Sequence, residues 1–320
     1  MRVLVTGAGG FVGRKVAAAV SSLGHELLLG LREVAKFSLD GAAYRKLDLV
    51  SSVESDYEFL SCVDVVIHTA ARVHIMDDRT LDPLAAFRAV NYLGTMKLAE
   101  HCVTRGVKRF IFISSIKVNG DATPLGNPFS ELDFPEPADA YGLSKFEAET
   151  ALLELAEKTN MEVVIIRPPL VYGPGVKANF KYLMNWLYKG LPLPLGAIHN
   201  KRSLVYIDNL VSLITTCIAH PAAANNIFLA GDGEDLSTPD LLRRMGAALG
   251  RPAKLIPVPS WLLNLVSSAI GKSDVAQRLC GSLQVDISKS KRVLGWIPPV
   301  SVNKALKDTA LAYLDEVKHQ

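Results

Sequence analysis

The sequence predicts an α/β protein whose main part is a doubly wound parallel sheet, followed by a smaller C-terminal α/β unit. Three observations support this prediction. Short apolar runs alternate with helical patterns through the first half of the chain, a glycine-rich turn follows the first run, and the alternation stops after Arg167. Strands that alternate with helices are typical of a parallel sheet covered on both faces.

The predicted strands are continuous apolar runs, which indicates burial on both faces of a sheet. Right-handed crossovers through the intervening helices give the doubly wound arrangement. The expected strands are Arg2–Val5, His25–Leu31, Ala43–Leu47, Val63–His68, Arg109–Ser114 and Met161–Arg167. The principal expected helices are Val12–Leu23, Leu81–Arg105 and Ala138–Asn160.

Prolines and glycines interrupt the pattern after Arg167. We therefore expect one domain over residues 1–167, with segments of about 202–231 returning to it, and a second domain made mainly of residues 168–320. A helix over Trp261–Ile270 is expected to pack inside the protein rather than lie on a membrane surface. Other expected elements are helices near Phe180–Lys189, Asn209–Ala219 and Thr238–Leu249, and a strand near Arg202–Ile207.

The composition is that of an ordinary globular protein, with 320 residues, 49% of them hydrophobic and 21% charged, and a formal net charge of +3. No Lys/Arg run suggests a nucleic-acid partner. The four cysteines lie outside metal-ligand spacings, so we expect reduced thiols and no metal site. No apolar stretch predicts a membrane span or a signal peptide, which favours the cytoplasm.

A glycine pattern follows the first strand directly. Gly7, Gly10 and Gly13 have the spacing GxxGxxG and precede an amphipathic helix. The first glycine permits a tight turn, the second lets backbone approach a pyrophosphate, and the third lets the helix pack close to the strand. The helix N-terminus supplies N–H groups for the phosphates. The pattern therefore predicts a dinucleotide-binding Rossmann fold.

The end of the second strand distinguishes the two nicotinamide dinucleotides. An acidic residue there binds the ribose hydroxyls of NAD, whereas an arginine accommodates the 2′-phosphate of NADP. The strand ends at Leu31 and Arg32, with Glu33 one position later. We therefore favour NADP, with NAD as the alternative. Asp48 and Leu49, after the third strand, are expected under the adenine.

Tyr141 and Lys145 form a YxxxK pair that shares one helix face. A tyrosine hydroxyl has a pKa of about 10, and a nearby ammonium group is expected to lower it toward the working range. Ser115 leaves the carboxyl end of the fifth strand, where ligands bind in open α/β sheets. Ser115 is thus expected to hold the substrate oxygen that Tyr141 protonates; Ser114 is the less favoured candidate.

The glycine motif, the Ser115 strand end, the Tyr141–Lys145 pair and the RPPLVYGPG segment from Arg167 together resemble the extended short-chain dehydrogenases/reductases. The resemblance covers essentially the whole chain. It implies that residues 1–167 bind NAD(P) and that residues 168–320 mainly bind a nucleotide-linked sugar. Further cofactor contacts that it implies are Phe11, Val12, Thr69, Ala70, Ala71, Asn91 and Pro168.

The same resemblance implies substrate contacts by Lys117, Asn179, Arg202 and Arg278. The two arginines would hold the diphosphate, to which a guanidinium fork is well matched. The long helices Leu81–Arg105 and Ala138–Asn160 would pair with their copies in a homodimer.

Three reactions share this scaffold. Dehydratases that resemble this chain carry an acidic pair after the catalytic serine, where this sequence has Ile116 and Lys117, so dehydration is not expected. Leu170 stands where related enzymes often have asparagine, and Ser282 or Leu283 would leave room for an N-acetyl group. We favour NAD(P)H-dependent reduction of the C4 ketone of a UDP-4-keto-6-deoxy-N-acetylhexosamine in bacterial O-antigen synthesis. The alternatives are a UDP-hexose or UDP-N-acetylhexosamine 4-epimerase and a non-catalytic NADP sensor.

Overall fold

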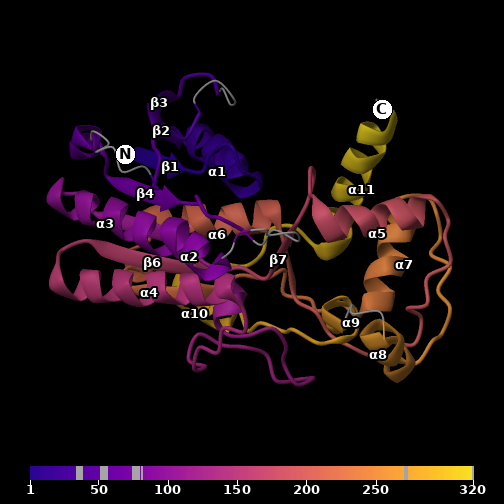
Figure 1. Ribbon diagram of the computed structural model, residues 1–320. Helices are drawn as coiled ribbons and strands as arrows, with labels where there is room; N and C mark the ends of the chain where they lie inside the picture. Colours follow the sequence, from indigo (N-terminus) through magenta and orange to yellow (C-terminus); the bar gives the residue numbers. More distant parts are fainter. Residues whose placement is uncertain (34–38, 51–56, 74–79, 81, 270–272, 319–320) are drawn as a thin grey trace.

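The computed structural model describes residues 1–33, 39–50, 57–73, 80, 82–269 and 273–318. Its centre is a seven-stranded sheet in the order β3-β2-β1-β4-β5-β6-β9, in which all neighbouring strands are parallel (Figure 1). The doubly wound fold predicted from the sequence is confirmed. The strands are β1 (Arg2–Thr6), β2 (Glu26–Leu31), β3 (Ala43–Lys46), β4 (Val65–His68), β5 (Arg109–Ile113), β6 (Glu162–Arg167) and β9 (Asn226–Leu229).

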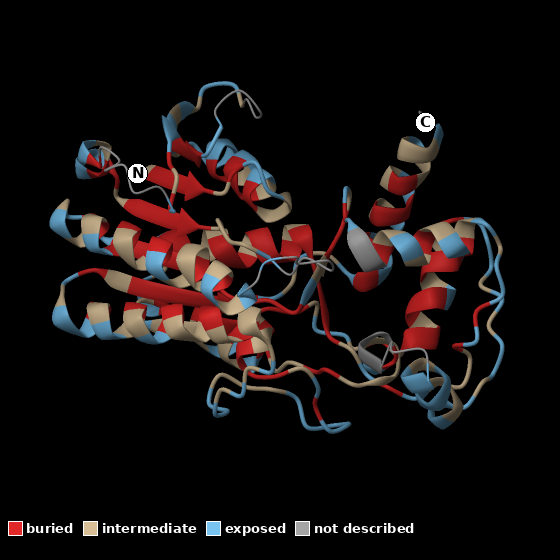
Figure 2. Cartoon of the chain, viewed as in Figure 1, coloured by how far each residue is buried: buried red, intermediate tan, exposed pale blue. Residues whose placement is uncertain are grey.

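Helices cover both faces of the sheet, and each face has its own apolar core (Figure 2). Alternate strand residues point to opposite sides, so Val3 and Val5 pack with α1 (Phe11–Ser22) and α6 (Ile207–Ala219). Leu4 and Phe110 pack instead with α3 (Thr95–Thr104) and α4 (Ala140–Lys158). Burial of each such side chain contributes about 1.5–3 kcal/mol, which explains why the strands read as continuous apolar runs.

The prediction of a single helix from Leu81 to Arg105 is wrong, because a π-helical turn divides this segment into two helices. Its first residue lies outside the described part of the chain. The structure has α2 (Pro83–Arg88), a π-helical turn η3 (Ala89–Gly94) and then α3. A Cβ on Gly94 would lie 2.7 Å from the Cβ of Leu49, so the wide turn sits tightly against the loop after β3. Such turns are rare and often occur at functional sites.

The C-terminal part contains a second, two-stranded parallel sheet made of β7 (Leu170–Tyr172) and β8 (Leu204–Tyr206). The segment between residues 207 and 229 contributes α6 and β9 to the main sheet layer. The division into two domains near residue 167 stays a prediction. The remaining helices are α5 (Ala178–Tyr188), α7 (Thr238–Ala248), α8 (Ser260–Ala269), α9 (Ser273–Cys280), α10 (Ser288–Leu294) and α11 (Val302–Lys318), with short 3-10 turns η2 (Glu58–Cys62), η4 (Ile116–Val118) and η5 (Pro221–Ala223).

Helix α8 does not pack inside the protein, contrary to the prediction for Trp261–Ile270. None of its residues is buried, and Trp261 is 66% exposed. The reason is its place at the outer edge of the C-terminal part, where it lies beside α9 and only Leu263 reaches the core (Figure 1). In the described part of the chain, no helix is long and apolar enough to cross a membrane.

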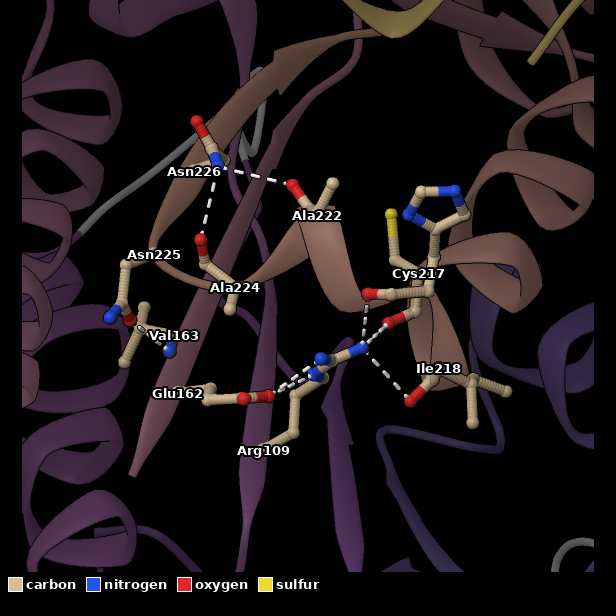
Figure 3. A network of polar contacts seen from close by, with 10 residues as sticks. Arg109, Glu162, Val163, Cys217, Ile218, Ala222, Ala224, Asn225 and Asn226 are labelled. Carbon is tan, nitrogen blue, oxygen red and sulfur yellow. Dashed lines mark hydrogen bonds and ion pairs between the residues drawn. The ribbon is translucent and has the colours of Figure 1, made fainter. Parts of the chain in front are cut away.

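Arg109 links the C-terminal end of α6 to the edge of the sheet at which β5 and β6 begin (Figure 3). Its guanidinium group is buried and donates to the carbonyl oxygens of Cys217, Ile218 and His220 at the end of α6, at 2.6–3.1 Å. It also pairs with Glu162 at the start of β6. A cation at a helix C-terminus satisfies carbonyls that lack helical partners. This network lies at the edge opposite the glycine turn, so its role is structural.

Candidate active site

The strand order reverses at β1, which lies between β2 and β4. In open α/β sheets, ligands bind at this switch point beyond the carboxyl ends of the strands. Here the loops after β1 and β4 touch: Gly7 has φ +68°, and a Cβ on it would lie 2.6 Å from the backbone nitrogen of Ala70. A Cβ on Gly13 would lie 2.2 Å from the carbonyl oxygen of Gly7. Neither position can hold a side chain without a backbone shift.

The first turn of α1 suits a pyrophosphate. The helix starts at Phe11 with Gly10 as its N-cap, no side chain caps it, and its first turn has no acidic residue. The N–H groups of that turn and the positive end of the helix dipole are therefore directed at the crevice. Phe11 and Val12 are half-buried at the mouth of this turn. The residues present thus fit a dinucleotide.

The adenosine end of the crevice follows β2 and β3. Arg32 is exposed directly after β2, as is Glu33. Asp48 is half-buried after β3 and accepts a hydrogen bond from the backbone of Val50 at 3.1 Å, while Leu49 is buried. The structure therefore brings Arg32 and Asp48 to the edge predicted for them.

A buried polar chain connects β1, β4 and the start of α3. The ring of His68 contacts the hydroxyl groups of Thr6 and Thr95, at 2.8 and 3.0 Å. Burial, and then the charge of Lys145, lower the pKa of His68 to about 3, so its ring is neutral at physiological pH. Thr69, Ala70 and Ala71 follow His68 and are half-buried beside the glycine turn. His68 thus holds this loop in place and is no proton donor.

Asn91 supports the helix that carries the predicted catalytic pair. It is fully buried in η3 and donates to the hydroxyl oxygen of Ser144 in α4 at 3.0 Å. Its amide also exchanges two hydrogen bonds with the backbone of Arg72, which follows β4. The wide helical turn at η3 thereby links α4 to the loop beside the glycine turn.

Ser115 and Tyr141 meet at the carboxyl end of β5. Tyr141, in the first turn of α4, lies close enough to the Ser115 hydroxyl for that group to lower the pKa of its phenol. The pKa of Tyr141 is raised to about 12, chiefly by burial; the Ser115 hydroxyl opposes this shift and the Asp139 carboxylate adds to it. Phe87 packs edge-on against the tyrosine ring, with centroids 5.9 Å apart. Ser114 is buried, and its hydroxyl has no hydrogen-bond partner in the described structure.

Lys145 lies one turn further along α4 and is 1% exposed. Its ammonium group donates to the Ile113 carbonyl oxygen at 2.8 Å and lies 4.3 Å from the Phe112 ring centre. Burial lowers the pKa of Lys145 to about 7, against the opposing charge of Glu149. The sequence predicted that Lys145 lowers the pKa of Tyr141. In the protein without cofactor, Ser115 is instead the group that lowers it, because the ammonium group is directed at β5.

A fully buried ion pair below this centre was missed by the sequence analysis. Glu149, one turn after Lys145, accepts a two-pronged contact from Arg167 at the end of β6. Arg167 also donates to the side chain of Asn119 at 2.9 Å. The i, i+4 spacing of Lys145 and Glu149 was the available signal, because such residues share a helix face. The next residue, Pro168, is buried, and its carbonyl accepts from Ile116 at 3.0 Å.

The structure describes the side chains of three of the four predicted substrate residues, Lys117, Arg202 and Arg278. Arg202 and Arg278 lie near each other, since the pKa of Arg202 is lowered by burial and then by the charge of Arg278. The carboxylate of Asp121 opposes this effect and also pairs with Lys117. Asp121 thus pairs with Lys117 and also acts by its charge on Arg202. The side chain of Asn179 lies outside the described residues.

A Rossmann sheet with a serine, tyrosine and lysine beside the glycine turn defines a nicotinamide-dinucleotide enzyme of the short-chain dehydrogenase/reductase type. Residues 3–231 match the NAD dependent epimerase/dehydratase family. The chain belongs to this family of enzymes.

The chain is 49% identical to a UDP-glucose 4-epimerase of Vibrio cholerae over 314 residues, which cover 98% of this chain and 95% of the relative. Similar solved structures include a UDP-glucose 4-epimerase from Thermotoga maritima with UDP-glucose (TM-score 0.78, 22% identity, 99% and 100% of the two chains). Another is a UDP-glucuronic acid 4-epimerase from Bacillus cereus with NAD (TM-score 0.79, 21% identity, 100% and 99%). These structural likenesses concern the fold.

Proposed function

We propose that the protein is an NAD-dependent 4-epimerase of a UDP-hexose. The observation that carries this proposal is the 49% identity to a UDP-glucose 4-epimerase over nearly the whole of both chains. Ser115 and Tyr141 support it, because they lie at the same edge of the sheet as the glycine turn and epimerisation needs an acid–base group next to the nicotinamide. This replaces the ketone reduction that we favoured from the sequence alone.

Each residue has a proposed task. The glycine turn and the first turn of α1 bind the pyrophosphate of NAD, which when bound accepts a hydride from C4 of the sugar and returns it. Tyr141 takes the proton of the 4-hydroxyl and gives it back, while Ser115 holds the same oxygen. Lys145 holds α4 against the end of β5 through its hydrogen bond to the Ile113 carbonyl oxygen, and so helps to position Tyr141 and Ser115. Arg202 and Arg278 bind the substrate diphosphate.

Reduction of a 4-keto sugar nucleotide is the second candidate. It is favoured by Arg32, which follows β2 where NAD-specific enzymes commonly carry an acid. An arginine at this place suits the 2′-phosphate of NADPH. If this reading holds, Arg32→Ala weakens NADPH binding at least tenfold and leaves NADH binding unchanged. Isothermal titration with each cofactor measures this directly.

The two candidates are separated by two incubations of the purified protein. An epimerase converts UDP-glucose to UDP-galactose with no net change in cofactor absorbance. A reductase consumes NADPH stoichiometrically with a UDP-4-keto-6-deoxy-N-acetylhexosamine and leaves UDP-glucose untouched. UDP-N-acetylglucosamine is included to test whether the site accepts an N-acetyl group. The Tyr141→Phe variant is the control, and its activity should fall by about 10²–10⁴-fold because the proton carrier is lost.

We also propose a homodimer in the cytoplasm, formed through the helices of residues 83–104 and α4. A groove lies along this face, where Tyr92, Leu93, Phe146 and Ala151 form an apolar strip bordered by Arg88, Glu147, Thr150 and Glu154, and Leu93 is 59% exposed. An exposed apolar face on adjacent helices is typical of a subunit interface. Light scattering coupled to size-exclusion chromatography should give twice the chain mass of 34.7 kDa, and Leu93→Glu should give the monomer.

A further inference from the structure

The backbone of Lys117 contacts Ser115 and also Gly142, the residue that follows Tyr141. Its N–H donates to the hydroxyl oxygen of Ser115 at 3.2 Å. Its carbonyl oxygen packs against the first turn of α4, where a Cβ on Gly142 would lie only 2.6 Å from it. The segment η4 therefore lies directly between the end of β5 and the start of α4.

The side chain of Lys117 pairs with two carboxylates. Its ammonium group forms an ion pair with Asp121 and a second with Asp139, the latter at 3.2 Å. The three side chains are only 28–31% exposed, so water screens them less than a surface pair. The other oxygen of Asp139 caps α4 by accepting from the backbone of Gly142 at 2.7 Å. One oxygen of Asp139 thus caps the first turn of α4 while the other pairs with Lys117.

The charge of Asp139 acts on Tyr141. That carboxylate raises the pKa of Tyr141, so a smaller fraction of the phenol is ionised and able to accept a proton at a given pH. A cation bound to Asp139 opposes this effect. Charged groups on the neighbouring elements are Lys145 one turn along the same helix, Asp121 after η4, and Arg72, which lies over the ring of Phe87 that packs against Tyr141.

We propose that Lys117 is a positioning residue of the active site, which holds Ser115 against the first turn of α4 and neutralises the Asp139 carboxylate beside Tyr141. This role rests on the proposed function, since it gives Tyr141 the task of acid and base. It differs from the substrate contact that the family resemblance implied for Lys117. Lys117 thus stands where dehydratases of similar sequence carry an acid. It acts on the charge beside Tyr141 and transfers no proton itself.

The first test compares pH profiles of kcat and KM for Lys117→Met, Lys117→Arg and Asp139→Asn. Loss of the cation should move the rising limb of kcat to higher pH by about half a unit to one unit, because the carboxylate is left unscreened. Lys117→Arg should restore most of the profile. Asp139→Asn should move the limb to lower pH, since asparagine still caps the helix but carries no charge.

The decisive arm is the double variant. With Asp139→Asn already present, Lys117→Met should shift the limb less than it does alone, because the carboxylate that it screened is gone. Lys304→Met is the matched control: Lys304 pairs with Asp308 at the same i, i+4 spacing on α11, far in sequence from the site. Its profile should equal that of the unaltered enzyme. A rise in KM with an unchanged kcat profile for Lys117→Met would overturn the proposal in favour of substrate binding.

A second measurement does not depend on the reaction. A difluorotyrosine placed at position 141 reports its own ionisation by ¹⁹F NMR, and fluorine brings the phenol pKa into an accessible range. Lys117→Met should raise that pKa and Asp139→Asn should lower it, in the protein saturated with NAD. If the shifts are present but no sugar nucleotide is turned over, the proposed function fails and the role of Lys117 stands. Equal pKa values in all three proteins would contradict the role itself.

Discussion

Burial shifts the pKa of both titratable groups in the active-site turn of α4 toward the uncharged form. It raises the pKa of Tyr141 to about 12 and lowers that of Lys145 to about 7. Both shifts disfavour the charged form, which is the mark of desolvation. A bound nicotinamide with its positive charge would favour the phenolate, so the site is tuned by what binds in it as well as by its own residues.

The displaced lysine makes stability depend on pH. Because the folded pKa of Lys145 lies below its unfolded value of 10.5, the unfolded chain binds more protons between about pH 7 and pH 10, and stability due to this group rises with pH there. Lys145→Met removes this dependence. Relative to the unaltered protein, the variant should therefore be more stable at pH 6 than at pH 9 by about 2 kcal/mol. Urea unfolding of the cofactor-free proteins at both values measures this, and parallel curves would contradict it.

The glycine turn is the element that depends most on the absence of side chains. Gly13→Ala would place a methyl group 2.2 Å from the Gly7 carbonyl oxygen and 2.7 Å from the Thr69 hydroxyl. We expect a loss of about 1–3 kcal/mol in unfolding free energy and at least a tenfold weaker NAD affinity. Gly9→Ala is the matched control in the same turn, because its methyl group would meet only Leu31, at 3.9 Å. Thermal melts and titration with NAD distinguish the two, and equal behaviour would refute the packing argument.

At the opposite edge, Arg109 determines how firmly α6 is attached. Arg109→Met leaves the carbonyls of Cys217, Ile218 and His220 without their donor, which should cost about 2–3 kcal/mol in unfolding free energy. Cofactor affinity should hardly change, because the network lies away from the glycine turn. Arg2→Met, which removes a more exposed pair with Glu26, should have a much smaller effect on chemical denaturation. A similar loss in both variants would argue against the role of the buried carbonyls.

For the molecule as a whole, local pattern was sufficient to predict the strands β1 to β6 and most of the helices beside them, but it did not predict β9 as a strand. The glycine turn and the serine each follow a strand, and parallel strands bring their carboxyl ends to one edge. The features that could not be predicted from the sequence depend on contacts between distant segments. The Glu149–Arg167 pair joins α4 to β6, and the π turn at η3 adapts to Leu49. The exposure of α8 follows from its place at the edge, which its own amphipathic pattern does not encode.

The choice between reaction types also depended on more than local residues. Arg32 and the missing acid after β2 favoured reduction, whereas similarity along the whole chain favours epimerisation. A single position at the adenosine end of the crevice says little about what happens at the nicotinamide end. The residues around Tyr141 suit both reactions, because each needs one proton carrier at the same oxygen.

The central claim is that one hydride leaves C4 of the sugar and returns to it within a single turnover. UDP-glucose deuterated at C4 tests this most directly, with unlabelled NADH and NADPH added in excess. The account predicts UDP-galactose that keeps the deuterium at C4, with none in the added cofactor. Absence of UDP-galactose, together with transfer of deuterium from labelled NADPH to a 4-keto sugar nucleotide, would contradict it and establish the reductase.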